Sequence, residues 1–184
     1  MNERYFYHVV TEKPMKGGQI IRFDHNHFNG VYDRVMACKK ILDGQKAIDP
    51  LEKFIQNNLE YWAVRTYREL ALEKVRKEKY PNYPSRMACL YTSRAFSDAK
   101  MWAAFFQNSK REVLQIVTLQ TDGHIFDGDA NNVFDGTEDE IENEKNAHDY
   151  WSNQPNKDKK KPLIETLIDG KIKVIEIVEE YPLS

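Results

Sequence analysis

The chain has 184 residues, of which 41% are hydrophobic and 30% charged, and its formal net charge is −2. This composition is typical of one globular domain, and it argues against both disorder and a general electrostatic attraction to nucleic acid. Because no membrane span, signal peptide or Cys-x-x-Cys motif is visible, we expect a single cytoplasmic domain over residues 1–184, with reduced thiols at Cys38 and Cys89 and no membrane partner.

The first predicted elements are a strand and a series of helices. Residues 5–10 are apolar and partly β-branched, which predicts a strand. Apolar residues then recur at helical spacing before a helix-ending glycine, Gly44, and these are Val31, Val35, Cys38 and Leu42. A sharper helix start follows, because Asp49 can cap, Pro50 suits the first turn and Glu52 completes a capping box. An apolar stripe then runs to about residue 78, as one long helix or as two with a bend.

The second half of the chain alternates strands with one further helix. Residues 87–92 and 113–119 predict strands, and a helix capped by Ser97 is expected between them, ending near Gln107. The segment 128–162 is long and polar, which predicts an irregular, mobile loop. Asp169-Gly170 between the apolar runs 163–168 and 171–178 predicts a β-hairpin with a two-residue turn. This order of elements predicts an α+β fold with a largely antiparallel sheet.

Three polar residues lie within these apolar strands. Pairing across the expected hairpin would place Glu165 on an apolar face with Leu167 and Val174, where a carboxylate needs a partner or water. Glu165 is then either an edge position open to water or a site acid held in a cleft. His8 and Tyr91 likewise have ordinary interpretations when each is taken alone, as a hydrogen-bonded core histidine and as a strand aromatic.

Taken together, these three positions resemble the ADP-ribosyltransferase superfamily of the diphtheria-toxin and poly(ADP-ribose)-polymerase type. That superfamily carries a His on its first strand, a Tyr on a middle strand and a Glu on a late strand. The resemblance is carried by three motifs, in chain order Tyr7-His8-Val9-Val10, Leu90-Tyr91-Thr92-Ser93 with Ser97 and Trp102 after it, and the segment 163–172 around Glu165. The whole chain also resembles a little-characterised bacterial family grouped near this superfamily.

The resemblance implies a fold and an activity. The fold is an ADP-ribosyltransferase-like α+β domain, with a mostly antiparallel split sheet and a helical insertion, about residues 30–80, between the first and second motif strands. The activity is cleavage of NAD and transfer of ADP-ribose to a macromolecular acceptor, either protein or nucleic acid. Glu165 would stabilise an oxocarbenium-like ribose, His8 would orient a ribose hydroxyl and Tyr91 would stack on nicotinamide. Ser97 and Trp102 would complete the NAD pocket, and no metal is implied.

The chain also departs from the superfamily pattern, which leaves alternatives open. Val9-Val10 follows His8 where the toxin and polymerase branches prefer Gly and then Thr or Ser. Competing acids follow Glu165 at the end of the last expected strand, namely Glu176, Glu179 and Glu180. The alternatives are a non-catalytic descendant that binds a nucleotide or a protein, an NAD glycohydrolase, and a relative of RNA 2′-phosphotransferases.

Two further patterns share some features with metal sites. His25 and His27 could share one strand face, but no third ligand is apparent. The acidic stretch 127–138 matches five side-chain positions of a calcium loop, but it has Asn132 where such loops place glycine. We expect neither to be a metal site.

Overall fold

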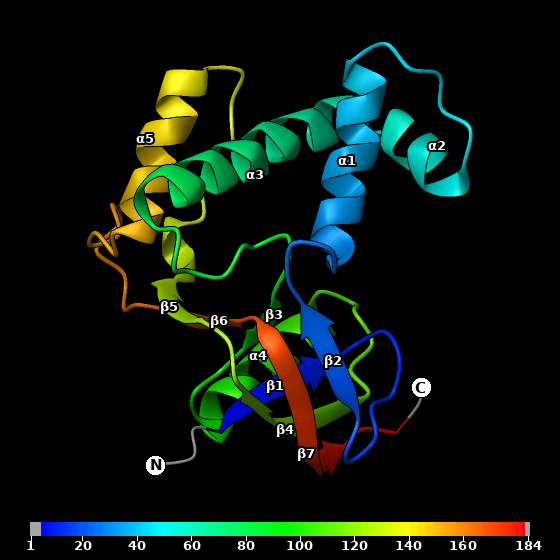
Figure 1. The fold of residues 1–184 in the computed structure, drawn as a ribbon, viewed down its shortest axis with the longest axis vertical. Helices are drawn as coiled ribbons and strands as arrows, with labels where there is room; N and C mark the ends of the chain where they lie inside the picture. The colour runs from blue at the N-terminus through cyan, green and yellow to red at the C-terminus, as the bar shows by residue number, and fades with distance from the viewer. Residues whose placement is uncertain (1–4, 183–184) are drawn as a thin grey trace.

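A computed structural model describes residues 5–182 and shows an α+β architecture (Figure 1). The helices are α1 (Gly30–Leu42), α2 (Pro50–Gln56), α3 (Leu59–Lys79), α4 (Phe96–Asn108) and α5 (Glu140–Trp151), and a short 3₁₀ turn, η1, spans Ala130–Asn132. The strands are β1 (Phe6–Val10), β2 (Ile20–Phe23), β3 (Leu90–Thr92), β4 (Gln115–Thr121), β5 (Ile125–Asp129), β6 (Ile164–Ile168) and β7 (Gly170–Glu180). Helices α1, α2, α3 and α5 gather at one end of the molecule, and the strands with α4 form the other end.

The strands form two antiparallel sheets that meet at one point. One sheet has the order β1-β4-β7-β2 and the other has the order β3-β6-β5. Tyr7 of β1 and Ser93, just after β3, exchange two backbone hydrogen bonds of 2.9 and 2.8 Å, so β1 lies next to β3 across the gap. The expected α+β class with a largely antiparallel sheet is therefore confirmed.

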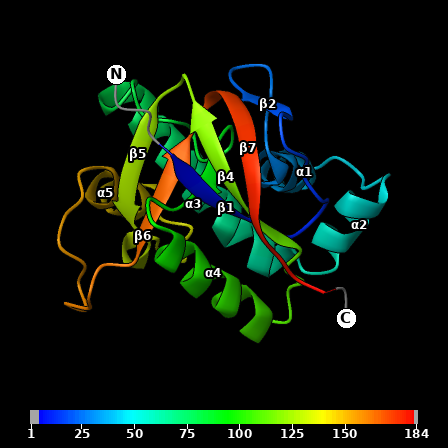
Figure 2. The same ribbon diagram turned by 90° about the horizontal axis from the view of Figure 1, so that it is seen from below.

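Apolar side chains on both sides of the strands hold the helices in place. Helix α4 covers β1 and β4, where Ala99 and Ala103 pack against Val9 and Ile116 (Figure 2). Helices α3 and α5 cover β5 and β6 through a second core that contains Leu72, Val75, Tyr150, Trp151, Phe126 and Leu167. Each sheet thus has a helical layer of its own, because a half-apolar sheet face must be buried against another element.

The helices between β2 and β3 follow the sequence pattern closely. Asp49 caps α2 and accepts a hydrogen bond from the backbone N–H of Glu52, whose side chain accepts in return from the Asp49 N–H, so the expected capping box is confirmed. The apolar stripe is divided into α2 and α3, with Asn57 and Asn58 between them.

The helix after β3 differs from expectation at its start. Ser97 is not a cap, because α4 begins one residue before it, at Phe96.

The predicted hairpin at Asp169-Gly170 is wrong. Strand β6 pairs with β3 and β5, whereas β7 pairs with β4 and β2, so the chain passes from one sheet to the other at this turn. Gly170 does have the positive φ that the turn motif requires. A short-range turn signal identifies the bend, but the partners of the two strands are decided by contacts far away in the sequence.

The predicted mobile loop over residues 128–162 is also wrong over its middle part. Asp139 caps α5 by accepting hydrogen bonds from the backbone N–H groups of Ile141 and Glu142. Three residues of α5, Ala147, Tyr150 and Trp151, are almost completely buried against α3 and β5. The acids of α5 lie outside its buried face, whose apolar residues recur three and four positions apart. Strand β2 was not among the expected elements either.

Neither cysteine in the described chain is paired, as expected: Cys38 and Cys89 are free and buried. Within residues 5–182, no helix combines the length and apolar character that crossing a bilayer requires.

Candidate functional site

The three strands that carry the motif residues are consecutive neighbours. Strand β1 with His8 lies beside β3 with Tyr91, and β3 pairs with β6, which carries Glu165. Residues opposite each other in an antiparallel pair point to the same face, and Tyr91 lies opposite Leu167. Because Glu165 is two residues before Leu167 on β6, Tyr91 and Glu165 point to one face of this sheet.

His8 links the two sheets through its ring. Its Nδ1 lies 2.8 Å from the carbonyl oxygen of Tyr91. Burial lowers the pKa of His8 to about 4, so the imidazole is neutral at pH 7. A carbonyl oxygen can only accept, so we assign the ring hydrogen to Nδ1. The other nitrogen, Nε2, then carries a lone pair that can accept a hydrogen bond from a hydroxyl group.

Tyr91 contacts Arg86 through both its hydroxyl group and its ring. Its hydroxyl group donates a 3.0 Å hydrogen bond to the carbonyl oxygen of Arg86, and the guanidinium of Arg86 lies 5.3 Å from the centre of its ring. Burial raises the pKa of Tyr91 well above its usual value, so the hydroxyl group stays protonated. This ring is therefore rigid and partly covered by a cation.

Glu165 is buried, with 8% of the residue exposed, and it has two partners. Arg86 Nη1 donates to its Oε1 at 2.6 Å, and the hydroxyl group of Tyr150 donates to the same oxygen at 2.7 Å. The hypothesis of an edge position open to water is therefore wrong. Both hydrogen bonds that reach Glu165 within residues 5–182 end on Oε1, which leaves Oε2 as the oxygen that could receive another group.

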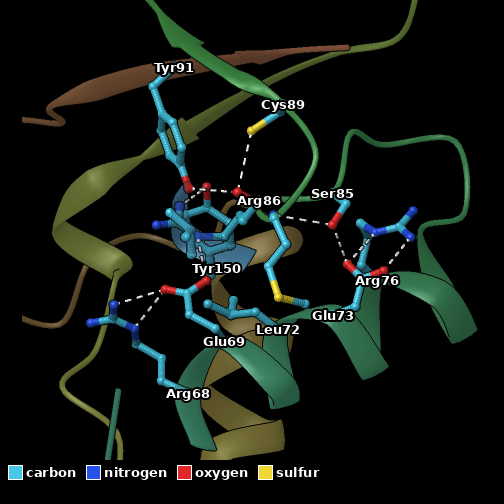
Figure 3. A network of polar contacts seen from close by, with 12 residues as sticks. Arg68, Glu69, Leu72, Glu73, Arg76, Ser85, Arg86, Cys89, Tyr91 and Tyr150 are labelled. Carbon is cyan, nitrogen blue, oxygen red and sulfur yellow. Dashed lines mark hydrogen bonds and ion pairs between the residues drawn. The ribbon is translucent and has the colours of Figure 1, made fainter. Parts of the chain in front are cut away.

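Arg86 is the centre of a wider network of charges (Figure 3). Its Nε donates to Glu69 on α3 at 3.2 Å, and Glu69 in turn accepts two hydrogen bonds from Arg68, at 3.0 and 2.8 Å. Burial would lower the pKa of Arg86, but Glu165, Tyr150, Tyr91 and Glu69 together raise it well above its usual value. The guanidinium is therefore permanently charged and joins β6, α3 and α5.

The two expected pocket residues on α4 lie in different environments. Trp102 is half-buried, and its Nε1–H points to the carbonyl oxygen of Ile164, next to Glu165, at 3.4 Å. Its indole also packs against Phe105 and Phe106. Ser97 is exposed in the first turn of α4. Trp102 thus contacts the strand of Glu165 directly, whereas Ser97 lies at the N-terminus of α4.

The competing acids lie away from this network. Glu176, Glu179 and Glu180 are all on β7, in the other sheet. Glu179 pairs with Lys100 of α4, and Glu180 accepts a hydrogen bond from Gln115. Of the acids considered from the sequence, Glu165 alone joins the cluster around Tyr91.

The metal-like patterns have other partners. His27 contacts Asp24 at 2.7 Å, and within residues 5–182 no group of three or more His, Cys, Asp or Glu side chains is arranged to hold a metal. In the acidic stretch, Asp129 accepts hydrogen bonds from Asn131, Asn156 and Leu163, so it ties two loop segments together.

Sequence reasoning missed three residues of this site, Arg86, Tyr150 and Glu69. Arg86 precedes the second motif strand by a few residues, and one buried arginine cannot be told from a surface arginine by spacing alone. Tyr150 belonged to the expected loop. The only available signal was the unsatisfied position of Glu165, since a carboxylate on an apolar face calls for a cation elsewhere in the chain.

Comparison with known proteins gives a family but no activity. The model of the family described as "Protein of unknown function (DUF2441)" matches residues 6–180, which includes every strand and helix of the fold. No curated protein matches the chain.

Proposed function

We propose that this chain, which belongs to the DUF2441 family, is an NAD-dependent ADP-ribosyltransferase with an ADP-ribosyltransferase-like fold. It cleaves the nicotinamide–ribose bond of NAD and transfers ADP-ribose to a macromolecular acceptor, protein or nucleic acid. The free thiols of Cys38 and Cys89 support a role in the reducing cytoplasm.

The observation that carries the proposal is the meeting of the three motif strands. His8, Tyr91 and Glu165 are far apart in the sequence, yet β1, β3 and β6 are consecutive neighbours at the junction of the two sheets. The His8 ring contacts the backbone of Tyr91, and both Tyr91 and Glu165 contact Arg86. Tyr91 and Glu165 share one sheet face and the cation of Arg86, whereas His8, on the face of β1 that carries Phe6, joins them through the backbone of Tyr91.

The reaction needs little from the protein besides charge and orientation. The bond between C1′ of the ribose and the nicotinamide nitrogen breaks, and its electron pair leaves with nicotinamide, which becomes neutral. Positive charge develops on the ribose in an oxocarbenium-like state. A nucleophile of the acceptor then attacks C1′ and loses its proton. A fixed negative charge near C1′ stabilises the charged state more than it stabilises bound NAD, and this difference accelerates the reaction.

The side chains have chemistry that matches these needs. Glu165 keeps Oε2 for the ribose, while Oε1 is held by Arg86 and Tyr150. Neutral His8 offers Nε2 as an acceptor for a ribose hydroxyl. The ring of Tyr91, which its hydroxyl group fixes, is suited to stacking on nicotinamide. Trp102, which reaches the strand of Glu165, is suited to form a pocket wall, with Ser97 at the start of the same helix.

One observation favours a second candidate, a non-catalytic descendant that binds a nucleotide. Glu165 is almost buried and is paired with a buried cation, which is the pattern of a structural ion pair. Two cavities lie away from Glu165. One, of about 390 Å³, is beside Lys171 and Lys173, and the other, of about 280 Å³, is between α3 and α5. The two candidates differ in a single measurable property, the release of nicotinamide.

The test is incubation of the full chain with NAD labelled in the adenylate part, with and without a cell lysate. We expect nicotinamide release that increases in the lysate, and label on protein or on nucleic acid. Glu165→Gln keeps the shape but removes the charge, so it should lower turnover by about 10²- to 10³-fold at unchanged NAD affinity.

The matched control is Glu176→Gln, which changes an exposed acid on the other sheet and should leave turnover unchanged. Rates are compared per folded molecule, since Glu165→Gln also weakens an ion pair. Binding of NAD with no nicotinamide release would favour the non-catalytic candidate. Release that is equally fast in Glu165→Gln would contradict the assignment of the acid.

A further inference from the structure

Three groups form a closed triangle of hydrogen bonds around one oxygen of Glu165. Arg86 Nη1 carries two hydrogens and directs one to Glu165 Oε1 at 2.6 Å and the other to the hydroxyl oxygen of Tyr150 at 2.8 Å. The same hydroxyl group donates its own hydrogen to Oε1 at 2.7 Å. Every hydrogen of this triangle has an acceptor, so the carboxylate of Glu165 is fixed in one orientation.

Arg86 is neutralised from two sides. One side faces Glu165, and the Nε side faces Glu69 of α3, whose carboxylate also holds Arg68. The two arginines and the two glutamates balance in formal charge. Side-chain exposure is only 4% for Glu69, 9% for Arg86 and 11% for Glu165, so bulk water screens these charges weakly.

We propose that Tyr150 and Glu69 are positioning residues for Glu165, so that the helical layer of α3 and α5 takes part in the reaction. The inference rests on the proposed function. Tyr150 fixes Oε1 and thereby aims Oε2 at the ribose. Glu69 supplies the second negative charge that Arg86 needs.

The role of Glu69 follows from the sign of the charges. A cation beside Glu165 opposes the positive charge that develops on the ribose, since like charges repel across a few ångströms in a weakly screened site. With Glu69 present, the charge of Arg86 is shared between two carboxylates, and Glu165 retains negative potential on its Oε2 side. Without Glu69, the formal charge of this network rises from zero to +1. The carboxylate of Glu165 must then neutralise Arg86 by itself.

The role of Tyr150 follows from the geometry. A phenylalanine at this position fills the same volume in the core but removes the hydrogen bond to Oε1 and the acceptor for Arg86 Nη1. The carboxylate can then rotate about its last bond. A misplacement of about 1 Å in a catalytic group is enough to reduce a rate by about 100-fold.

The experiment is steady-state nicotinamide release by wild type, Tyr150→Phe and Glu69→Gln, with rates given per folded molecule. For both variants we expect kcat to fall by about 10- to 100-fold, while KM for NAD changes little. Glu69→Asp keeps the charge and should retain more of the wild-type kcat than Glu69→Gln.

Glu73→Gln is the matched control. Glu73 lies one turn further along the same helix and is also held by hydrogen bonds, from Arg76 and Ser85, but it does not contact Arg86. It should keep the wild-type kcat. The inference is overturned if wild type releases nicotinamide and Tyr150→Phe and Glu69→Gln release it equally fast, or if Glu73→Gln loses as much kcat as Glu69→Gln. A wild-type protein that binds NAD but releases no nicotinamide is a different result, which overturns the proposed function and this inference with it.

Discussion

His8 is a neutral, partly buried imidazole, and this property has a consequence for stability. Burial lowers its pKa in the folded state to about 4, against 6.5 in the unfolded chain, although the hydrogen bond with Tyr91 acts in the opposite direction. Above pH 6.5 neither state binds this proton. Between pH 6.5 and 4 the unfolded chain gains the proton first, so the folded state loses stability as the pH falls.

We therefore predict that the wild type loses up to about 3 kcal/mol through His8 between pH 7 and pH 4, at about 1.4 kcal/mol per unit of pKa shift. His8→Gln lacks this titration and should lose correspondingly less. Urea denaturation at each pH measures the difference. His25→Gln removes an exposed imidazole and serves as the control. Equal pH dependence for His8→Gln and wild type would contradict the lowered pKa of His8 and its neutral state.

Site residues could be proposed from the sequence only where the local pattern was unusual. These were polar residues within apolar strands, namely His8, Tyr91 and Glu165. Their order along the chain resembles the motifs of the ADP-ribosyltransferase superfamily. Arg86 could not be proposed, because its partners Glu69 and Glu165 lie 17 and 79 positions away. Pairing over such separations is decided by tertiary packing, which leaves no trace in local spacing.

At the scale of single elements, helix α5 is the part of the fold most different from expectation. It was expected as part of a mobile loop, yet it buries Trp151, whose Nε1–H donates a 2.8 Å hydrogen bond to the carbonyl oxygen of Leu72 on α3. Polar residues dominate the composition of this segment. Composition reflects the outer face of a helix, whereas its fold depends on the few apolar residues of the inner face.

We predict that Trp151→Ala lowers the free energy of unfolding by about 3–5 kcal/mol, the usual cost of truncating a large core side chain. Ile141→Ala on the same helix changes a side chain that is 82% exposed, and it should change stability by less than about 0.5 kcal/mol. Thermal or urea unfolding measures both. A loss of less than about 1 kcal/mol in Trp151→Ala would indicate that α5 is not packed as described.

The turn between β6 and β7 gives a second prediction at this scale. Gly170 has a φ of +77°, and a Cβ atom there would lie 2.7 Å from Gly123 Cα. Gly44 has a similar φ of +83°, but a Cβ atom there would meet nothing within 4 Å. Both positions therefore carry the same backbone cost for alanine, and only Gly170 carries crowding as well.

Gly170→Ala should thus destabilise the protein by at least about 1 kcal/mol more than Gly44→Ala does. The comparison by urea unfolding cancels the backbone term. Equal losses for the two variants would contradict the close approach of β7 to the segment around Gly123. The hairpin pattern of Asp169-Gly170 correctly predicted the bend and its glycine. It failed on the pairing, because either sheet could accept the strand that follows.

At the scale of the whole molecule, the junction of the two sheets connects the strands to the helical layer of α3 and α5. Strands β1 and β3 meet there through Tyr7 and Ser93, and the charge network around Arg86 joins this region to the helical layer. The α+β class and the antiparallel pairing could be predicted from the order of elements. The split into two sheets could not be derived from periodicity, which shows the faces of a strand but not its neighbours.

The central claim is that this junction binds NAD, and thermal unfolding with and without NAD tests it most directly. A ligand selective for the folded state stabilises it by about 1.4 kcal/mol at ten times its Kd, which corresponds to a rise of about 3–6 °C for a chain of this size. We predict such a rise for the wild type at millimolar NAD. The rise should be much smaller for His8→Gln and Tyr91→Ala, each compared with its own Tm without NAD. It should be unchanged for Tyr61→Ala, an exposed aromatic of α3. No rise in the wild type, or an equal rise in all four proteins, would contradict an NAD site at this junction.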